Sequence, residues 1–426
     1  MISQFWKISV IVVLASAILL GACTSSAPTE PTVPGEITAV IGFTVSQSGS
    51  LNLESSRQTN GLNLWMKQVN EAGGVRLKDG SVVKFAAKYY DDESSKDRVQ
   101  QLYTRLVTSD DAAFLISPYS SGLADAAAVV AEQYSRIMIT TGAASDSTYK
   151  RGFTLVYQAY TPASRYLTSA VDLLKKTDPD ASKIAILHEN DKFSTDVANA
   201  AKAYAVEQGY QVVFFEGYDT GTTDFAPYIN KIENTAPDAI LGGGHFQDGS
   251  TFAKQLYEKQ IDVKMVALLV APPEDNFTEI GDAARGIIGP SQWEPQVNFS
   301  PETAALVNLP FFGISSADFA SSYKAQYGEE PSYHAAGGYA AGLILQNAIE
   351  TAGTLDTQAV KAVLDQMNMV TFFGHIRFDP SEETHGLQIG HSMVYIQWQP
   401  AESGQLVKQV VWPEEAASAS VIYPLR

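Results

Sequence analysis

Short apolar segments alternate with helical patterns along most of this chain. From Thr38 to Val270, each apolar segment of strand length is followed by apolar residues at helical spacing. Such alternation predicts parallel sheets with helices on both faces, because parallel strands need a crossover between them. The fold class is therefore α/β. The expected strands are residues 38–45, 82–90, 113–116, 136–140, 183–187, 211–218, 239–242 and 263–270.

Two hydroxyl-rich loops follow neighbouring strands of the first half. Residues 117–122 read Ser-Pro-Tyr-Ser-Ser-Gly, and residues 141–145 read Thr-Gly-Ala-Ala-Ser. In a parallel sheet both loops leave the carboxyl edge, where open α/β sheets bind ligands, and a helix N-terminus there attracts anions. The loops predict a polar pocket, although the serines could instead serve as helix caps. The candidate ligand contacts are Tyr119, Ser120, Ser121, Gly142, Ala143 and Ser145.

The length of the chain predicts two lobes. Its 426 residues exceed the ~250–300 at which a single hydrophobic core stops growing. We expect two Rossmann-like lobes joined by three crossings of the chain, an arrangement that forms a hinge and closes around a ligand. Residues 372–378 are expected as a strand of the second lobe. The expected boundaries are 37–157 with 294–370 for the first lobe, 158–293 with 371–412 for the second, and 413–426 for a C-terminal tail.

The first residues have the pattern of an export signal. Residues 8–20 form an apolar run that suits the core of a signal peptide and falls short of the ~20 residues of a membrane span. The run ends in Leu20-Gly21-Ala22-Cys23, which resembles a bacterial lipobox, and Cys23 is the only cysteine. We expect residues 1–22 to be a lipoprotein signal peptide, Cys23 to be lipidated, and residues 23–36 to form a tether rich in Pro, Ser and Thr. A plain secretory signal with a chance cysteine is the alternative.

Charge and motifs exclude several classes of function. The formal net charge of −18 argues against nucleic acid as a partner, because binding phosphates needs a basic face. The sequence has no nucleophile elbow, P-loop, dinucleotide fingerprint or zincin motif, and its six histidines show no metal-ligand spacing. We therefore expect neither an enzyme nor a bound metal or cofactor. An esterase or amidase built on the same lobes is the enzymatic alternative.

Several short motifs occur in one order along the chain. They are Ile41-Gly42, Asn60-Gly61, the segment Val-Asn-Glu-Ala-Gly-Gly-Val at 69–75, Tyr90-Asp91-Asp92, Ser120-Ser121, and Phe373-Gly374 followed by Ile376-Arg377-Phe378-Asp379. In this order they resemble the leucine/isoleucine/valine-binding protein family, the type I solute-binding proteins of ABC importers. The resemblance implies a lipid-anchored extracytoplasmic protein with an ABC permease as partner. Its solute would be an amino acid, branched-chain or related, or a similar small polar molecule. A sensor of the same fold, coupled to a signalling partner, is the alternative.

The resemblance also assigns residues outside the first two loops. Phe193 and His245 fall where the family has aromatic residues, with His245 in place of a tyrosine, and Ala144 stands where many members have threonine. The acidic residue that would hold an α-ammonium has no match after residues 263–270, and Glu274 is a candidate substitute. Trp293, after the return crossing, is expected either to stack on the ligand or to pack between the lobes.

Overall fold

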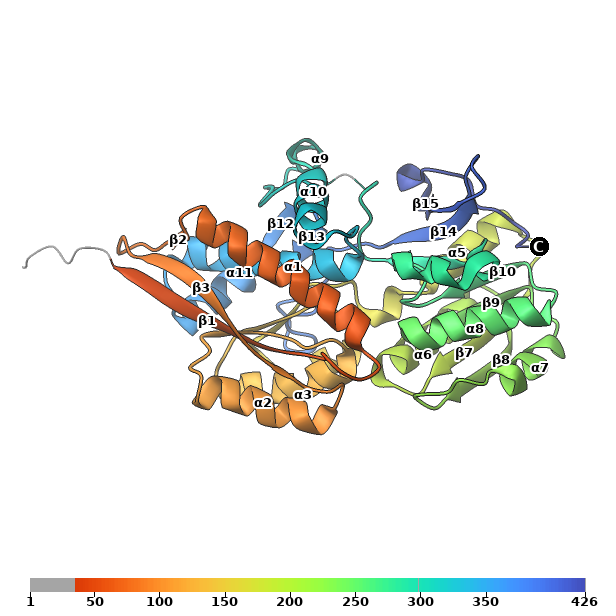
Figure 1. The fold of residues 1–426 in the computed structure, drawn as a ribbon, viewed down its shortest axis with the longest axis horizontal. Coiled ribbons are helices and arrows are strands. Elements are labelled where there is room, and N and C mark those ends of the chain that lie inside the picture. Colours follow the sequence, from red (N-terminus) through yellow and green to blue (C-terminus); the bar gives the residue numbers. More distant parts are fainter. Residues whose placement is uncertain (1–34, 298, 426) are drawn as a thin grey trace, which may run out of the picture. The chain divides into compact units, whose positions relative to one another are not determined.

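The computed structural model describes residues 35–297 and 299–425. The expected signal peptide, Cys23 and the expected tether up to residue 34 lie outside this part of the chain. Within it, two sheets lie side by side, each with helices packed around it (Figure 1). We call the six-stranded sheet with its helices the first lobe, and the seven-stranded sheet with its helices the second lobe.

The first lobe is built on the strand order β2-β3-β1-β4-β5-β6. Strands β3, β1, β4, β5 and β6 are parallel, and only the short β2 runs antiparallel to β3. The central strands are buried on both faces, which explains their continuous apolar sequences. The strand bounds are β1 (Glu36–Val45), β2 (Val75–Arg76), β3 (Val82–Asp91), β4 (Phe114–Ile116), β5 (Met138–Thr140) and β6 (Val156–Gln158).

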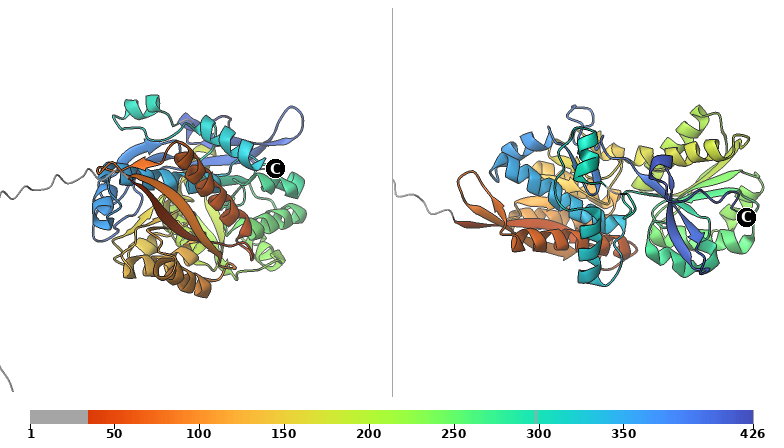
Figure 2. Two further views of the ribbon diagram at one scale, coloured as in Figure 1. Left: turned by 60° about the vertical axis from the view of Figure 1, so that its left-hand side comes forward. Right: turned by 90° about the horizontal axis from the view of Figure 1, so that it is seen from above.

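The second lobe has the strand order β15-β14-β11-β10-β9-β7-β8. Strands β11, β10, β9, β7 and β8 are parallel, and β14 and β15 add an antiparallel hairpin at one edge. The C-terminal end of the chain lies at this lobe (Figure 2). The strand bounds are β7 (Lys183–Glu189), β8 (Gln211–Tyr218), β9 (Ala239–Gly243), β10 (Met265–Leu268), β11 (Ile288–Ser291), β14 (Val394–Pro400) and β15 (Leu406–Trp412).

Helices connect the parallel strands, as the alternation predicted. Those that follow strands of the first sheet are α1 (Asn52–Glu71), α2 (Lys96–Thr108), α3 (Ser121–Gln133) and α4 (Asp146–Tyr149). Those of the second lobe are η1 (Ala163–Arg165), α5 (Thr168–Thr177), α6 (Lys192–Glu207), α7 (Ala226–Glu233), α8 (Phe246–Lys259), η2 (Asp275–Ala284) and η3 (Glu414–Ala416). After β11 come α9 (Pro301–Leu306), α10 (Ser316–Tyr327), α11 (Tyr333–Ala352) and α12 (Thr357–Leu364).

The chain passes between the lobes three times. It leaves the first sheet after β6, returns after β11 to helices that include α11, and crosses again before β14. These are the crossings that the sequence predicted. Each lobe is therefore assembled from segments far apart in the sequence, and the three connections join the lobes near one another.

Glycines bring helices α1 and α11 into close contact. A Cβ atom on Gly61 of α1 would lie 1.8 Å from the carbonyl oxygen of Ala335, and one on Gly338 of α11 would lie 1.9 Å from the carbonyl oxygen of Gln58. The two backbones can approach this closely only because neither glycine has a side chain. The packing holds the first turns of both helices at the same edge of the first lobe.

One segment differs from the expected arrangement, and the expected C-terminal tail packs against a lobe. The strand expected over residues 372–378 does not join the seven-stranded sheet, because β13 (Gly374–Arg377) pairs with β12 (Asn368–Thr371) in a sheet of its own. Residues 413–425 pack on the second lobe, where the backbone N–H of Leu425 donates to the carbonyl of Lys264 at 2.7 Å. Across the described residues, no helix combines the length and apolar character needed to cross a membrane.

Candidate functional site

The carboxyl ends of strands from both lobes face a common space. On the first lobe, β4 leads to the loop with Tyr119 and Ser120, and β5 leads to the loop with Gly142. On the second lobe, β9 leads to His245 and β10 leads to Val270. Loops at the carboxyl ends of parallel strands are where open α/β sheets bind ligands. The two lobes therefore present their binding edges to each other.

A narrow cavity, which we call the inner cavity, lies between these loops. Its empty space is about 230 Å³ including the part open to solvent, of which only about 10 Å³ can hold the centre of a water molecule, so side chains nearly fill it in this form. Most of the wall consists of aromatic rings, together with small residues of the two hydroxyl-rich loops. The lining residues are Tyr119, Ser120, Ser121, Gly142, Ala144, Tyr160, Tyr166, Phe193, His245, Val270, Tyr333 and His334.

A larger and more polar space, which we call the outer cleft, adjoins the inner cavity at Ser120 and His245. It measures about 1330 Å³ including the part open to solvent. Hydroxyl groups and carboxylates line it, among them those of Ser94, Glu189 and Asp248. The outer cleft gives the inner cavity a route to solvent between the lobes.

The sequence-predicted residues that line the inner cavity come from both lobes. Tyr119, Ser120, Ser121 and Gly142 lie on the first-lobe side, and Phe193 and His245 on the second-lobe side. The ring of Phe193 packs edge-on against Tyr166 with centroids 5.0 Å apart. The structure thus brings together six of the residues singled out from the sequence. Ala144, where a threonine was noted in related proteins, also lines the cavity and offers no hydroxyl.

Ser121 connects the two hydroxyl-rich loops. Its Oγ accepts hydrogen bonds from the backbone N–H groups of Ala144 at 3.0 Å and Ser145 at 3.2 Å. The two amides that a ligand carboxylate could have used are therefore bound to this hydroxyl. Its own proton remains free to donate to a ligand.

Four other sequence candidates do not line the inner cavity. Ala143 and Ser145 are buried in the loop behind it, and among the described residues Ser145 Oγ has no hydrogen-bond partner. Trp293 packs edge-on against Phe319 and Phe372, and its Nε1–H donates to Ser316 Oγ at 3.2 Å. Its ring is thus part of the core. Glu274 is fully buried but points elsewhere.

Glu274 joins the lobes instead. It belongs to the loop after β10, and its carboxylate reaches first-lobe side chains. Oε2 pairs with the guanidinium of Arg57, and Oε1 accepts from Nδ1 of His334 at 2.6 Å. Burial alone would raise the pKa of Glu274, but the hydrogen bond and charge of His334 and the charge of Arg57 lower it to about 2. The carboxyl group is therefore ionised, and both of its oxygens already have partners.

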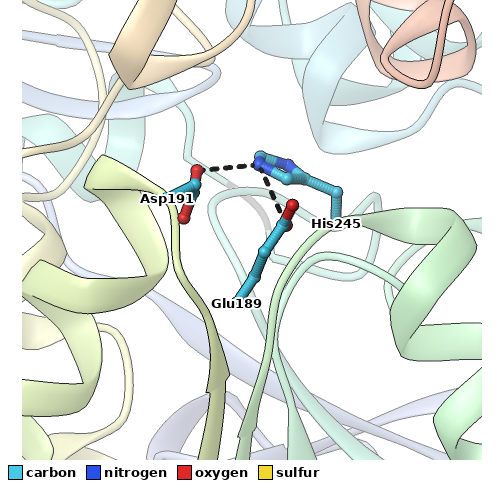
Figure 3. Close-up of side chains that lie close together, drawn as sticks. All are labelled: Glu189, Asp191 and His245. Atoms are coloured by element: carbon cyan, nitrogen blue, oxygen red, sulfur yellow. Dashed lines mark hydrogen bonds and ion pairs between the residues drawn. The ribbon is translucent and has the colours of Figure 1, made fainter. Parts of the chain in front are cut away.

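His245 forms a second connection between the lobes. Its Nδ1 lies 2.7 Å from Tyr119 Oη across the gap, and its Nε2 lies 3.1 Å from Asp191 Oδ2 and 3.9 Å from Glu189 Oε2 (Figure 3). Burial disfavours a charged ring, but the hydrogen bond and charge of Asp191 and the charges of Glu189 and Glu54 raise the pKa of His245 to about 10. The imidazolium therefore persists at neutral pH, with both N–H groups donating.

Glu189, Asp191 and His245 also have the donor atoms of a metal site. Their ligand atoms lie within 4.8 Å of one another, and the group includes nitrogen and carboxylate ligands of the kinds that Zn²⁺ accepts. A metal ion would have to displace the proton that His245 shares with Asp191, because only a neutral imidazole coordinates metal. In this arrangement the group acts as a hydrogen-bonded charge cluster that fixes the histidine ring.

Sequence reasoning missed several residues around the site. Arg57, Tyr160, Tyr166, Val270, Tyr333 and His334 were not proposed as site residues. One signal was present for Arg57. Glu54, Arg57 and Gln58 are three polar residues in the first two turns of a helix that follows the carboxyl end of a strand. Their burial in the structure shows that this polar face points inward. No local pattern marked His334, which begins a helix composed mainly of small and apolar residues.

Comparisons with known proteins agree with this geometry. A family model described as periplasmic binding protein matches residues 38–405. A Leu/Ile/Val-binding protein homologue 7 of Brucella suis is 26% identical over 422 residues, covering 96% of this chain and 97% of the relative.

Two solved structures share the fold. The substrate-binding protein LivJ of Streptococcus pneumoniae, in complex with isoleucine, superposes with a TM-score of 0.71 at 22% identity, covering 88% of this chain and 100% of that one. A solute-binding protein of an ABC transporter from R. palustris, in complex with 4-hydroxybenzoate, gives 0.73 at 20% identity, covering 88% and 96%. This chain therefore belongs to the periplasmic binding protein family, has the type I fold, and counts leucine/isoleucine/valine-binding proteins among its relatives.

Proposed function

We propose that this protein is the extracytoplasmic solute receptor of an ABC importer. It closes its two lobes on a small solute and presents the closed form to the permease. The solute is an amino acid, branched-chain or related, or a similar small polar molecule, and it occupies the inner cavity. The observation that carries the proposal is the cavity itself, enclosed by side chains of both lobes and bridged by Tyr119 and His245 at 2.7 Å.

The mechanism is a binding equilibrium between open and closed forms. A ligand that contacts both lobes is bound more tightly by the closed form, and it shifts the population by that difference in affinity. We assign ligand contact to Ser120, Ser121 and Gly142 on one side, and to Phe193 and His245 on the other. Rings from both lobes would then cover the solute.

The direct test is a thermal-shift screen of the purified protein against amino acids, amides, urea, short carboxylates and sugars. At least one class should raise the melting temperature, because a ligand that binds only the folded state stabilises it by mass action. Small-angle scattering with that compound should show a smaller radius of gyration. A compound that raises the melting temperature without compaction would contradict lobe closure.

We further propose that Cys23 anchors the receptor to a bacterial cell membrane as a lipoprotein. The support is the Leu20-Gly21-Ala22-Cys23 sequence and the absence of any other cysteine. Wild-type protein should fractionate with membranes, and Cys23→Ser should appear in the extracytoplasmic soluble fraction. Equal membrane association of both proteins would contradict the lipid anchor.

A further inference from the structure

Aromatic rings from both lobes enclose the inner cavity. Tyr119, Tyr160 and Tyr333 contribute from the first lobe and its crossings, and Tyr166 and Phe193 from the second. Val270 closes the side next to β10. Apart from the hydroxyl-rich loops, a solute in this cavity touches mainly flat apolar surface. Such a wall suits a ring or a branched aliphatic chain.

None of the described side chains that line the inner cavity carries a carboxylate. The nearby acids are already engaged: Glu274 pairs with Arg57 and His334, and Asp191 accepts from His245 and from the backbone N–H of Ser194. A buried ammonium without a carboxylate partner costs several kcal/mol in desolvation. The α-amino group of an amino acid would meet that cost here.

One acid nearby retains a free oxygen. Glu54 accepts from the backbone N–H of Phe246 through Oε1, and its Oε2 has no partner among the described residues. Glu54 does not line the inner cavity, and burial raises the pKa of its carboxyl group against the opposing charges of His245 and His334. It is the side chain that would have to turn toward an ammonium if one were bound.

The hydrogen-bond donors around the cavity favour an anion. Nε2–H of His245 donates to Asp191, and Nδ1–H donates to Tyr119 Oη, so the phenolic proton of Tyr119 is free for an acceptor inside the cavity. His334 lines the cavity as well, but its Nδ1–H donates to Glu274, so its Nε2, buried without a partner in the described part of the chain, is an acceptor unless the ring carries both protons. The hydroxyl groups of Tyr119 and Ser121 can both donate to a carboxylate.

From these observations we infer that the inner cavity binds a small carboxylate that lacks an α-amino group and carries a ring or a branched aliphatic body. The inference rests on the solute-binding role proposed above and narrows its substrate class. The carboxylate accepts hydrogen bonds from Tyr119 and Ser121, and His245 holds the Tyr119 hydroxyl in place, while the body lies between Phe193, Tyr166 and Tyr333.

Matched pairs of compounds that differ only in the amino group test this directly. Calorimetry on the purified protein would compare 4-methylpentanoate with leucine, and 3-phenylpropanoate with phenylalanine. The acids without an amino group should bind at least about tenfold more tightly, since the unpaired ammonium is penalised. Tighter binding of leucine or phenylalanine than of the matched acid would overturn the inference and leave the receptor function intact.

Other results of the screen separate the two proposals. If only amides, urea or sugars stabilise the protein, the inference is wrong and the receptor function stands. If no solute class stabilises or compacts the protein, both fail.

Tyr119→Phe removes the phenolic donor together with the acceptor of His245 Nδ1–H, and it should weaken binding of the preferred acid by about tenfold or more, in keeping with a hydrogen bond to a charged group. Unchanged affinity in this variant would contradict the assigned carboxylate position.

A variant can also reverse the preference. Val270→Glu places a carboxylate in the cavity wall, whereas Val270→Gln has nearly the same shape without the charge. The Glu variant should favour leucine over 4-methylpentanoate, and the Gln variant should not. If both variants fold and neither changes the ratio of the two affinities, Val270 does not set the selectivity and the inferred ligand position is wrong.

Discussion

At the scale of single residues, two neighbouring serines have different roles. Ser121 Oγ holds the amides of Ala144 and Ser145, whereas no capping hydrogen bond is made by the Ser120 side chain at the start of α3. Ser121→Ala leaves two buried amides without their acceptor and should lower the free energy of unfolding by about 1–3 kcal/mol. Ser120→Ala is the matched control and should leave it nearly unchanged. Urea denaturation distinguishes them, and equal midpoints would contradict the bridging role of Ser121.

Because of His245, we expect the free energy of unfolding to decrease at alkaline pH. Its pKa rises from 6.5 to about 10 in the folded protein, because Asp191 and Glu189 stabilise the charged ring more than burial destabilises it. A raised pKa means that the contribution of His245 is fully present below pH 6.5 and is lost as the pH increases through about 10. Denaturation of the wild type and of His245→Gln between pH 6 and 10.5 measures it. The difference between them should shrink with rising pH, and a constant difference would contradict the ion pair.

Helices and their caps show what the sequence can and cannot determine. The alternation of strands and helices was confirmed, because periodicity reports which face of each element is buried. Helix α8 begins at Phe246, although Gly249 is the first residue of its buried face, because the backbone N–H of His245 donates to Asp248 at 2.8 Å. The cap therefore starts the helix before its apolar pattern begins, and an apolar pattern alone cannot predict that start. The placement of Glu274 depends on Arg57, which is 217 positions away, so no local pattern could reveal it.

The contact between helices α1 and α11 holds Arg57 of α1 and His334 of α11 near each other. Gly338→Ala would place a Cβ 1.9 Å from the carbonyl oxygen of Gln58, so the helices must separate. We expect a loss of about 1–3 kcal/mol in the free energy of unfolding from overpacking. Gly122→Ala is the control, since no atom lies within 4 Å of its Cβ in helix α3, and it should be neutral or slightly stabilising. Equal losses in the two variants would contradict close backbone packing.

For the whole molecule, we expect the Glu274 contact to determine how firmly the lobes stay closed. Arg57 and His334 belong to one lobe and Glu274 to the other, and all three are buried. Glu274→Gln removes the charge and leaves the guanidinium of Arg57 without its buried partner. Removing one member of a buried ion pair destabilises a protein by about 3–5 kcal/mol. Here only the closed form is destabilised, because water can reach the guanidinium of Arg57 once the lobes separate.

The expected result is a larger radius of gyration for Glu274→Gln than for the wild type at the same solute concentration, measured by small-angle scattering. Glu258→Gln removes an exposed carboxylate of α8 and serves as the control, with no change expected. Because the pKa of Glu274 is lowered to about 2, its contribution to closure is present above pH 4.5 and lost as the pH falls through 2. The wild type should therefore expand over that range, and the variant should expand less. Equal compactness of variant and wild type near pH 7 would mean that the closed form does not depend on this carboxylate.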